Sequence, residues 1–152
     1  MRFDDLMDAA LEEARRARDA GEVPIGAIVA LDDVIVGRGF NQPITSGDPT
    51  AHAEIVAIRD AARRVGNYRL PGAVVCVTIE PCLMCVGALV HARVATLVYG
   101  AAEPKTGAVV STVRALSLPG NNHRVEVFAQ VRDEECRALM QAFFLSRRPG
   151  RT

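Results

Sequence analysis

Two short segments of this 152-residue chain restrict its fold more than any others, because together they have the side chains of a metal site. The first is His52-Ala53-Glu54, and the second is Pro81-Cys82-Leu83-Met84-Cys85 further along the chain. One imidazole and two thiols can bind zinc, and a nearby carboxylate can move protons. The sequence therefore predicts that the two segments lie side by side in the folded protein.

The spacing within each segment places it at the start of a helix. Cys82 and Cys85 are spaced as i and i+3, so both sulfurs lie on one helix face, and Pro81 suits the entry to that helix. A helix N-terminus also favours thiolates. His52 falls in the first turn of another predicted helix, with Glu54 about 200° around the axis. Both side chains border one cavity if the metal lies over the helix N-terminus, so we expect two helix N-termini to face each other across one ion.

Three protein ligands, His52, Cys82 and Cys85, leave one position of a tetrahedral zinc ion open, which is typical of a catalytic site. Two thiolates neutralise the ion, so a bound water is less acidified than in a three-imidazole site, and a nearby base is needed. Glu54 can supply that base. The alternative is a closed structural site, whose fourth ligand would be one of His91, His123, Cys76 or Glu54 itself.

The composition is that of an ordinary globular protein, with 49% hydrophobic and 24% charged residues, and the length is enough for one domain over residues 1–152. The acidic N-terminal residues 1–5 lack the apolar stretch of a signal peptide. The longest apolar stretch, around residues 82–90, is too short to span a bilayer. We therefore expect a cytoplasmic protein, in which cysteines are metal ligands or core residues rather than disulfides.

The formal net charge is zero, from 18 basic and 18 acidic residues, whereas nucleic-acid-binding proteins usually carry a basic excess. The charge is uneven, because residues 4–13 are rich in acids and residues 147–152 carry arginines and no acid. Matching of charges to helix dipoles and a solvated tail explain this asymmetry. Composition alone therefore does not indicate a nucleic-acid partner.

The pattern of apolar residues predicts alternating helices and strands. Helices are predicted at 3–17, 51–65, 82–92 and 133–148, and strands at 24–31, 34–40, 73–78, 94–99 and 124–131. Thr50 is expected to cap the second helix, residues 41–50 to form a loop, and residues 100–120 to be mostly loop with a short helix around 111–116. A helix, two paired strands and then alternating helices and strands are typical of an α/β layered domain with a mixed sheet and helices on both faces.

These motifs resemble those of the zinc-dependent cytidine and deoxycytidylate deaminase superfamily. Within it, the chain from Phe3 to Arg148 is most similar to the bacterial tRNA-specific adenosine deaminases. The zinc motif alone is also compatible with deaminases of cytosine, cytidine, deoxycytidylate or guanine. The further stretches that favour the tRNA branch are 23–27, 41, 48–54, 67–70, 80–88, 105–108, 122–126 and 143–144.

The resemblance implies a three-layer α/β/α cytidine-deaminase-like fold with a central mixed five-stranded sheet. It also implies a homodimer with one Zn²⁺ per subunit and a tRNA anticodon stem-loop as partner. The implied reaction is hydrolytic deamination of adenosine to inosine at the wobble position of that loop. Carried over by motif, His52, Cys82 and Cys85 hold zinc, and Glu54 shuttles protons as the catalytic residue.

The resemblance also implies which residues border the flipped base. Asn41 is expected to hydrogen-bond the base, with backbone groups of Ala53 and Pro81 beside it and Val23 lining the pocket. The residues alone allow simpler roles, because Asn41 also suits a turn after a strand and Val23 also suits the core.

Further residues are implied to contact the RNA outside the pocket. Lys105 resembles a contact to the RNA backbone, and Glu103 stands where family members often carry aspartate, in the loop that approaches the ribose. Phe144, Arg147 and Arg148 resemble the C-terminal helix that meets the RNA, with the arginines as phosphate contacts. Without the resemblance, Lys105 is equally a solvated loop residue, and the aromatic positions of this helix fit a core stripe.

Two other functions are compatible with the sequence. One is a deaminase of a free base or nucleoside, such as guanine, cytosine or cytidine. The other is a zinc-stabilised RNA-binding module without activity, against which Glu54 and the three apparent metal ligands argue. A dimer, with the apolar helix at 82–92 in its interface, would allow basic patches of two subunits to form one RNA surface despite the neutral net charge.

Overall fold

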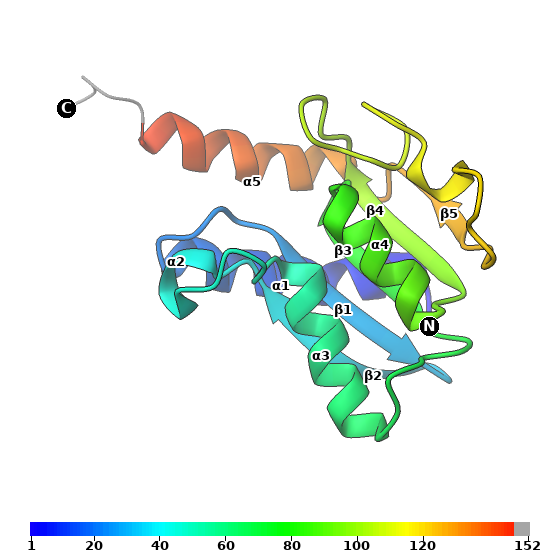
Figure 1. Cartoon of the computed structure of the whole chain (residues 1–152). Helices are drawn as coiled ribbons and strands as arrows, with labels where there is room; N and C mark the ends of the chain where they lie inside the picture. Colours follow the sequence, from blue (N-terminus) through cyan, green and yellow to red (C-terminus); the bar gives the residue numbers. More distant parts are fainter. Residues whose placement is uncertain (148–152) are drawn as a thin grey trace.

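The expected α/β/α fold is confirmed by a computed structural model that describes residues 1–147, in which helices cover both faces of a five-stranded mixed sheet (Figure 1). The helices are α1 (Phe3–Asp19), α2 (Pro43–Ser46), α3 (Ala53–Val65), α4 (Leu83–Ala92) and α5 (Asp133–Ser146), with a short 3₁₀ helix, η1 (Ala115–Ser117). The strands are β1 (Gly26–Leu31), β2 (Val34–Phe40), β3 (Val74–Ile79), β4 (Thr96–Ala101) and β5 (Glu126–Phe128).

The strands follow the order β2-β1-β3-β4-β5. β1 is antiparallel to both β2 and β3, whereas β3, β4 and β5 are parallel. Alternate residues of β1 point to two separate cores, with Ala27 and Val29 in one and Ile28 and Ala30 in the other. α3 and α4 contribute buried residues to the first core, and α1 and α5 contribute buried residues to the second, so the sheet is buried on both faces.

This topology brings four chain segments to one edge of the sheet. β3 and β4 end at this edge, and antiparallel pairing places the start of β1 and the end of β2 beside them. The N-termini of α3 and α4 lie at the same edge (Figure 1). Ligands bind at the carboxyl ends of strands in open α/β sheets, so this edge is where a functional site is expected.

Small residues hold α3 close against β2. A Cβ atom at Gly39 would lie 2.5 Å from the carbonyl oxygen of Ala53 and from the amide nitrogen of Ala57, so only glycine fits there. On the helix side, Ala53, Ala57 and Ala61 are fully buried. This close packing fixes the N-terminal turn of α3 over the edge of the sheet.

Several observed elements differ from the predicted ones. β4 lies two residues later than predicted, and the short helix is η1 at Ala115–Ser117 rather than around 111–116. α3 begins at Ala53 rather than at residue 51, because the side chain of Asp48 accepts hydrogen bonds from the amide and hydroxyl of Thr50, which therefore does not cap the helix. The predicted loop 41–50 contains the short helix α2. The last strand, β5, is shorter than predicted, because it pairs with β4 over only three residues. Within the described part of the chain, no helix is long and apolar enough to cross a membrane.

Candidate metal centre and active-site pocket

His52 and Cys82 occupy the N-cap positions of α3 and α4. Both have extended backbones, with φ and ψ of −71° and 154° at His52 and −77° and 174° at Cys82. Neither side chain caps its own helix, so the imidazole and the thiol are free to turn towards each other. The expected arrangement of two facing helix N-termini is present, and the partial positive charge of each terminus favours anionic groups between them.

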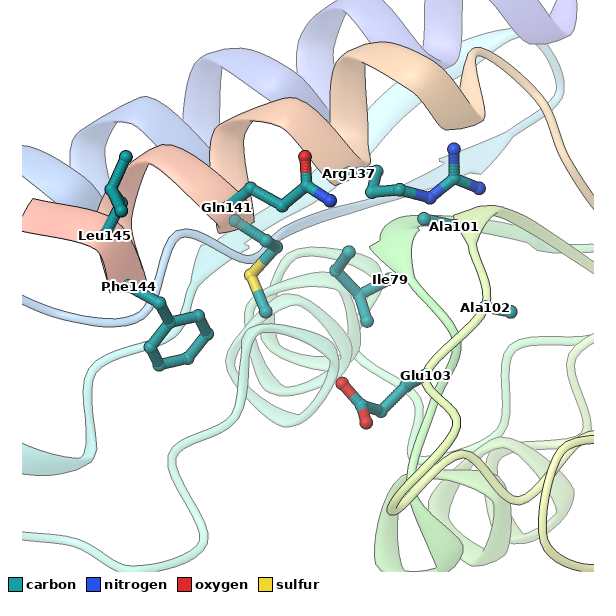
Figure 2. Close-up of a pocket in the computed structure, with 9 residues that line it drawn as sticks. Ile79, Ala101, Ala102, Glu103, Arg137, Gln141, Phe144 and Leu145 are labelled. Carbon is teal, nitrogen blue, oxygen red and sulfur yellow. The ribbon is translucent and has the colours of Figure 1, made fainter. Parts of the chain in front are cut away.

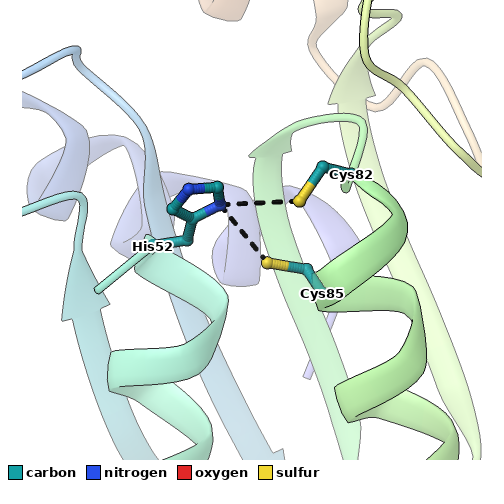
Figure 3. A group of neighbouring side chains, drawn as sticks. All are labelled: His52, Cys82 and Cys85. Atoms are coloured by element: carbon teal, nitrogen blue, oxygen red, sulfur yellow. Dashed lines mark hydrogen bonds between the residues drawn. The ribbon is translucent and has the colours of Figure 1, made fainter. Parts of the chain in front are cut away.

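The imidazole and both thiols converge on one point (Figure 3). Nδ1 of His52 lies 3.5 Å from Sγ of Cys82 and 3.6 Å from Sγ of Cys85, and all three atoms lie within 4.8 Å of one another. Zinc bound tetrahedrally, with Zn–N of about 2.0 Å and Zn–S of about 2.3 Å, places its nitrogen and sulfur ligands about 3.5 Å apart. The observed distances and donor types therefore fit a zinc ion.

The residues that could have closed the coordination shell lie elsewhere. Nε2 of His123 is 2.6 Å from the carbonyl oxygen of Val94, and Cys76 packs against Met7. His91 is exposed in the last turn of α4. Among residues 1–147, the metal-binding group consists of His52, Cys82 and Cys85 without Glu54, which argues against a closed structural site.

The charges around this group also suit a divalent cation. The Cys85 thiol hydrogen-bonds to Cys82 and, with the N-terminal turn of α4 and His52, lowers the pKa of Cys82 to about 5 despite its burial. The hydrogen bond to Cys82, burial and the nearby Glu54 raise the pKa of Cys85. Burial raises the pKa of Glu54 to about 7. Ionised Cys82 opposes the ionisation of Cys85 and Glu54, and a cation among the three groups would relieve this repulsion.

A pocket of about 240 Å³ opens beside the candidate metal ligands. Its lining combines apolar walls with a few polar groups, and comprises Val23, Ile25, Asn41, His52, Glu54, Ile79, Glu80, Cys82, Glu103, Thr106, Met140 and Phe144. Glu54 is only 4% exposed, so its carboxyl group is largely shielded from bulk water. An enclosed, mostly apolar pocket with a few convergent polar groups is typical of a small-molecule or base-binding site.

The structure places most of the predicted site residues at this pocket. Val23, Asn41, His52, Glu54, Cys82, Glu103 and Phe144 line it directly. Cys85, Ala53 and Pro81 are buried next to lining residues without lining the pocket themselves. Lys105 and Arg147 are exposed outside it, and Arg148 lies outside the described residues.

A second hollow, of about 380 Å³, adjoins the pocket between α5 and the ends of β3 and β4. It shares four lining residues with the pocket, namely Ile79, Glu103, Met140 and Phe144. Figure 2 shows Glu103 on one side of this hollow and Phe144, from α5, on another. The two cavities are therefore direct neighbours, and half-exposed Phe144 lines both of them.

Four of the lining residues had no predicted role in the site: Ile79, Glu80, Thr106 and Met140. Glu80 is the most unusual of these, because it is an acidic residue only 3% exposed. Burial raises the pKa of its carboxyl group, but hydrogen bonds from the Ser111 hydroxyl and from backbone amides outweigh burial and lower that pKa overall. Its position directly before Pro81 and Cys82 was the available signal in the sequence.

Residues 2–101 match the family model for the cytidine and deoxycytidylate deaminase zinc-binding region. The chain is 45% identical over 149 residues to the tRNA-specific adenosine deaminase of Haemophilus influenzae, covering 96% of this chain and 86% of that protein. It is 44% identical over 143 residues to the tRNA-specific adenosine deaminase of Agrobacterium fabrum, covering 94% of each.

The fold is similar to a solved structure from a study of A-to-I editing by tRNA:A34 deaminases at the wobble position of transfer RNA. The TM-score is 0.87 at 44% sequence identity, over 89% of this chain and 98% of the other. The similarity in fold therefore extends over most of this chain and nearly all of the other.

Proposed function

The chain belongs to the cytidine and deoxycytidylate deaminase family, and we propose that it is the zinc hydrolase that converts adenosine to inosine at the wobble position of a tRNA. The observation that carries this proposal is the His52, Cys82 and Cys85 group, with buried Glu54 beside it on the wall of a pocket. The tRNA-specific relatives, at 45% and 44% identity over nearly the whole chain, favour this substrate over a free base or nucleoside. Residues 1–152 would act as one deaminase domain, in the cytoplasm with its tRNA substrate.

His52, Cys82 and Cys85 would hold the zinc ion, and Glu54 would carry the protons. When bound, zinc would act as a Lewis acid that makes a water molecule more acidic, and Glu54 would complete the activation of that water for attack at C6 of adenine. Glu54 takes a proton from the attacking water and delivers it to N1. It then takes the remaining proton of the attacking oxygen and transfers it to the exocyclic nitrogen, so that ammonia leaves as the C6 carbonyl forms. Glu54 is only 4% exposed, so bulk water is largely kept from the protons that it would move.

Asn41 would orient the base in the pocket. Its side chain lines the pocket and is 8% exposed, while its backbone amide donates to the carbonyl oxygen of Ile25 at 2.9 Å. That hydrogen bond fixes the residue and leaves its side-chain amide free for a base edge. Backbone groups of Ala53 and Pro81 would border the base, and Val23 would pack against it.

The surface around the pocket would bind the anticodon stem-loop. Phe144 offers a ring for stacking, and Glu103 would approach the ribose. Lys105 follows Glu103 by two residues, Arg147 follows Phe144 by three, and both cations are exposed. We propose that they contact phosphates, as does Arg148, which lies outside the described residues. The guanidinium of Arg147 stacks on the Phe143 ring at 4.4 Å, which holds this cation on the surface of α5.

We propose that the protein forms a homodimer through the exposed face of α4. Leu83 and Met84, in the first turn of this helix, are 58% and 38% exposed. Leu83 and other apolar residues of α4 line a cavity at this face, together with Leu118, Gly120, Asn121 and Asn122. Light scattering should report a dimer, and Leu83→Glu should shift it towards monomer, whereas Leu145→Glu on α5 should not. A wild-type monomer at micromolar concentration would exclude the dimer.

The experiment that tests the function is incubation of the zinc-loaded protein with an anticodon stem-loop that carries adenosine at the wobble position. Inosine should appear at that position, detected by mass spectrometry of the digested RNA. Free adenine, adenosine, guanine, cytosine and cytidine should not be deaminated at a comparable rate. Release of ammonia from one of these small molecules, with no inosine in the stem-loop, would favour the alternative deaminase.

A further inference from the structure

One wall of the pocket is a long segment with little regular structure. Residues 102–114, between β4 and η1, contain no helix or strand apart from an isolated bridge between Gly107 and Cys82. Glu103 and Thr106 of this segment nevertheless line the pocket. Their positions must therefore be fixed by contacts other than a regular backbone ladder.

The carboxylate of Glu80 makes these contacts. Its Oε1 accepts hydrogen bonds from the amide of Glu103 at 3.1 Å and from the hydroxyl of Ser111 at 2.5 Å. Its Oε2 accepts from the amides of Val109, Val110 and Ser111, at 3.1, 2.9 and 3.1 Å. One side chain thus joins the beginning and the end of the segment 103–111.

The surroundings of Glu80 compensate the charge of this carboxylate and leave space for it. It is 3% exposed, and the ion pairs found among residues 1–147 do not include it, so backbone amides and one hydroxyl compensate its charge. Gly107 provides the space, because a Cβ atom there would lie 2.4 Å from Cδ of Glu80. The amide of Ala108 also donates to the carbonyl oxygen of Pro81 at 2.8 Å, which ties the segment to the residue before Cys82.

We propose that Glu80 is a positioning residue for substrate binding: it gathers the segment 103–111 and so holds Glu103 and Thr106 at the mouth of the pocket. This inference rests on the proposed function, because the RNA substrate is what that mouth would contact. Glu80 also lines the pocket, but both of its carboxylate oxygens accept hydrogen bonds from the segment, so it acts through the segment. Its loss should therefore weaken substrate binding more than turnover or zinc binding.

Glu80→Gln is the sharpest variant, because glutamine has nearly the same shape. An amide offers one acceptor oxygen and one nitrogen that only donates. The oxygen can still accept from the cluster of amides at residues 109–111, and the Ser111 hydroxyl can turn to accept from the new nitrogen. The amide of Glu103 cannot keep its hydrogen bond, because it would face the new nitrogen, which is also a donor. The substitution should therefore release the Glu103 end of the segment.

For the zinc-loaded full-length protein, we expect Glu80→Gln to raise KM for the stem-loop about tenfold or more, with kcat within about threefold of wild type. Hydrogen exchange in the peptide that contains residues 102–112 should accelerate, and zinc content should be unchanged. Glu13→Gln is the matched control, because Glu13 is also 3% exposed but pairs with Arg16 and Arg38 on the other side of the sheet. It should leave KM unchanged. If Glu80→Gln does not fold, Ser111→Ala removes one of the same hydrogen bonds and should produce a smaller change of the same kind.

An unchanged KM, unchanged exchange in residues 102–112, or an equal rise in KM for Glu13→Gln would each overturn the positioning role. A loss of kcat with KM unchanged would also overturn it. These results differ from failure of the proposed function, which would appear as wild-type protein that forms no inosine in the stem-loop.

Discussion

His52 and Cys82 are each the N-cap residue of a helix, and their side chains meet with Nδ1 and Sγ 3.5 Å apart. An N-cap has an extended backbone, so its side chain can leave the helix axis without disturbing the turns that follow. Cys85, one turn into α4, then reaches the same point. Two helix starts at one edge of the sheet are therefore sufficient to assemble the three zinc ligands.

Glu54→Gln should abolish most of the turnover and retain zinc. Glutamine keeps the volume of the buried side chain but cannot accept the proton of the attacking water. General acid–base groups contribute about 10²- to 10⁴-fold to rates, so kcat should fall by about that factor. Inosine formation measures the loss, and metal analysis checks the zinc. A variant that deaminates at the wild-type rate would show that another group carries the proton.

Cys82→Ala should lose zinc as well as activity, because a three-ligand site cannot tolerate loss of a thiolate. We expect the zinc content to fall from about one ion per chain to a small fraction of that, with a lower Tm. Cys76→Ala is the matched control, because Cys76 is a fully buried thiol that packs against Met7 away from the site. Equal zinc content in the two variants would contradict the assigned ligands.

Gly39→Ala should both destabilise the fold and disturb the metal centre. The new Cβ would lie 2.5 Å from the carbonyl oxygen of Ala53, which forces α3 away from β2. Overpacking of this kind costs about 1–3 kcal/mol, measurable by urea unfolding. Gly37→Ala meets α3 one turn later, at the carbonyl oxygen of Ala57. Zinc affinity should fall more in Gly39→Ala than in Gly37→Ala, and the reverse order would contradict this role for the close packing.

Glu22 should make the free energy of unfolding depend on pH in the acidic range. Burial raises the pKa of its carboxyl group, but hydrogen bonds from the hydroxyl and amide of Thr45 and from the amide of Ile44 lower it overall from 4.5. A lowered folded-state pKa contributes stability that is full above pH 4.5 and is lost as the pH falls through the folded-state value. The difference in unfolding free energy between wild type and Glu22→Gln should therefore shrink between pH 7 and pH 3.

Asp19→Asn is the control for that measurement, because Asp19 is exposed near the same end of α1 and pairs with exposed Arg18. Its effect on stability should be small at both pH values. A difference for Glu22→Gln that stays constant with pH would show that its carboxyl group has the same pKa in the folded and unfolded states.

The convergence of His52, Cys82 and Cys85 and the fold class could be predicted from the sequence because their signals are local. The ligands lie at fixed spacings at the starts of amphipathic helices, and alternation of helices and strands predicts the layers. The start of α3 was placed too early because Thr50 has the chemistry of a cap, while the competing acceptor, Asp48, lies two residues before it. Such competition depends on side-chain geometry that a sequence pattern does not contain.

The role of Glu80 could not be predicted in the same way. Its hydrogen-bond donors lie 23 to 31 residues further along the chain, and most are backbone amides, which leave no mark in the sequence. An acidic residue is expected to be exposed, so only the tertiary structure reveals this buried carboxylate. The helix α2 was missed for a related reason, because its Pro43 start and Gly47 end occur in a segment whose composition predicts a loop.

X-ray absorption at the zinc edge, on protein purified without chelator, tests the incomplete coordination shell on which the proposed chemistry depends. The result should be one zinc per chain with two sulfur ligands at about 2.3 Å and two nitrogen or oxygen ligands at about 2.0 Å, one from the imidazole and one from water. Glu54→Gln should give the same spectrum. A shell with three or more sulfur ligands, a shell without sulfur, or protein that binds no zinc would contradict a site built from His52, Cys82 and Cys85.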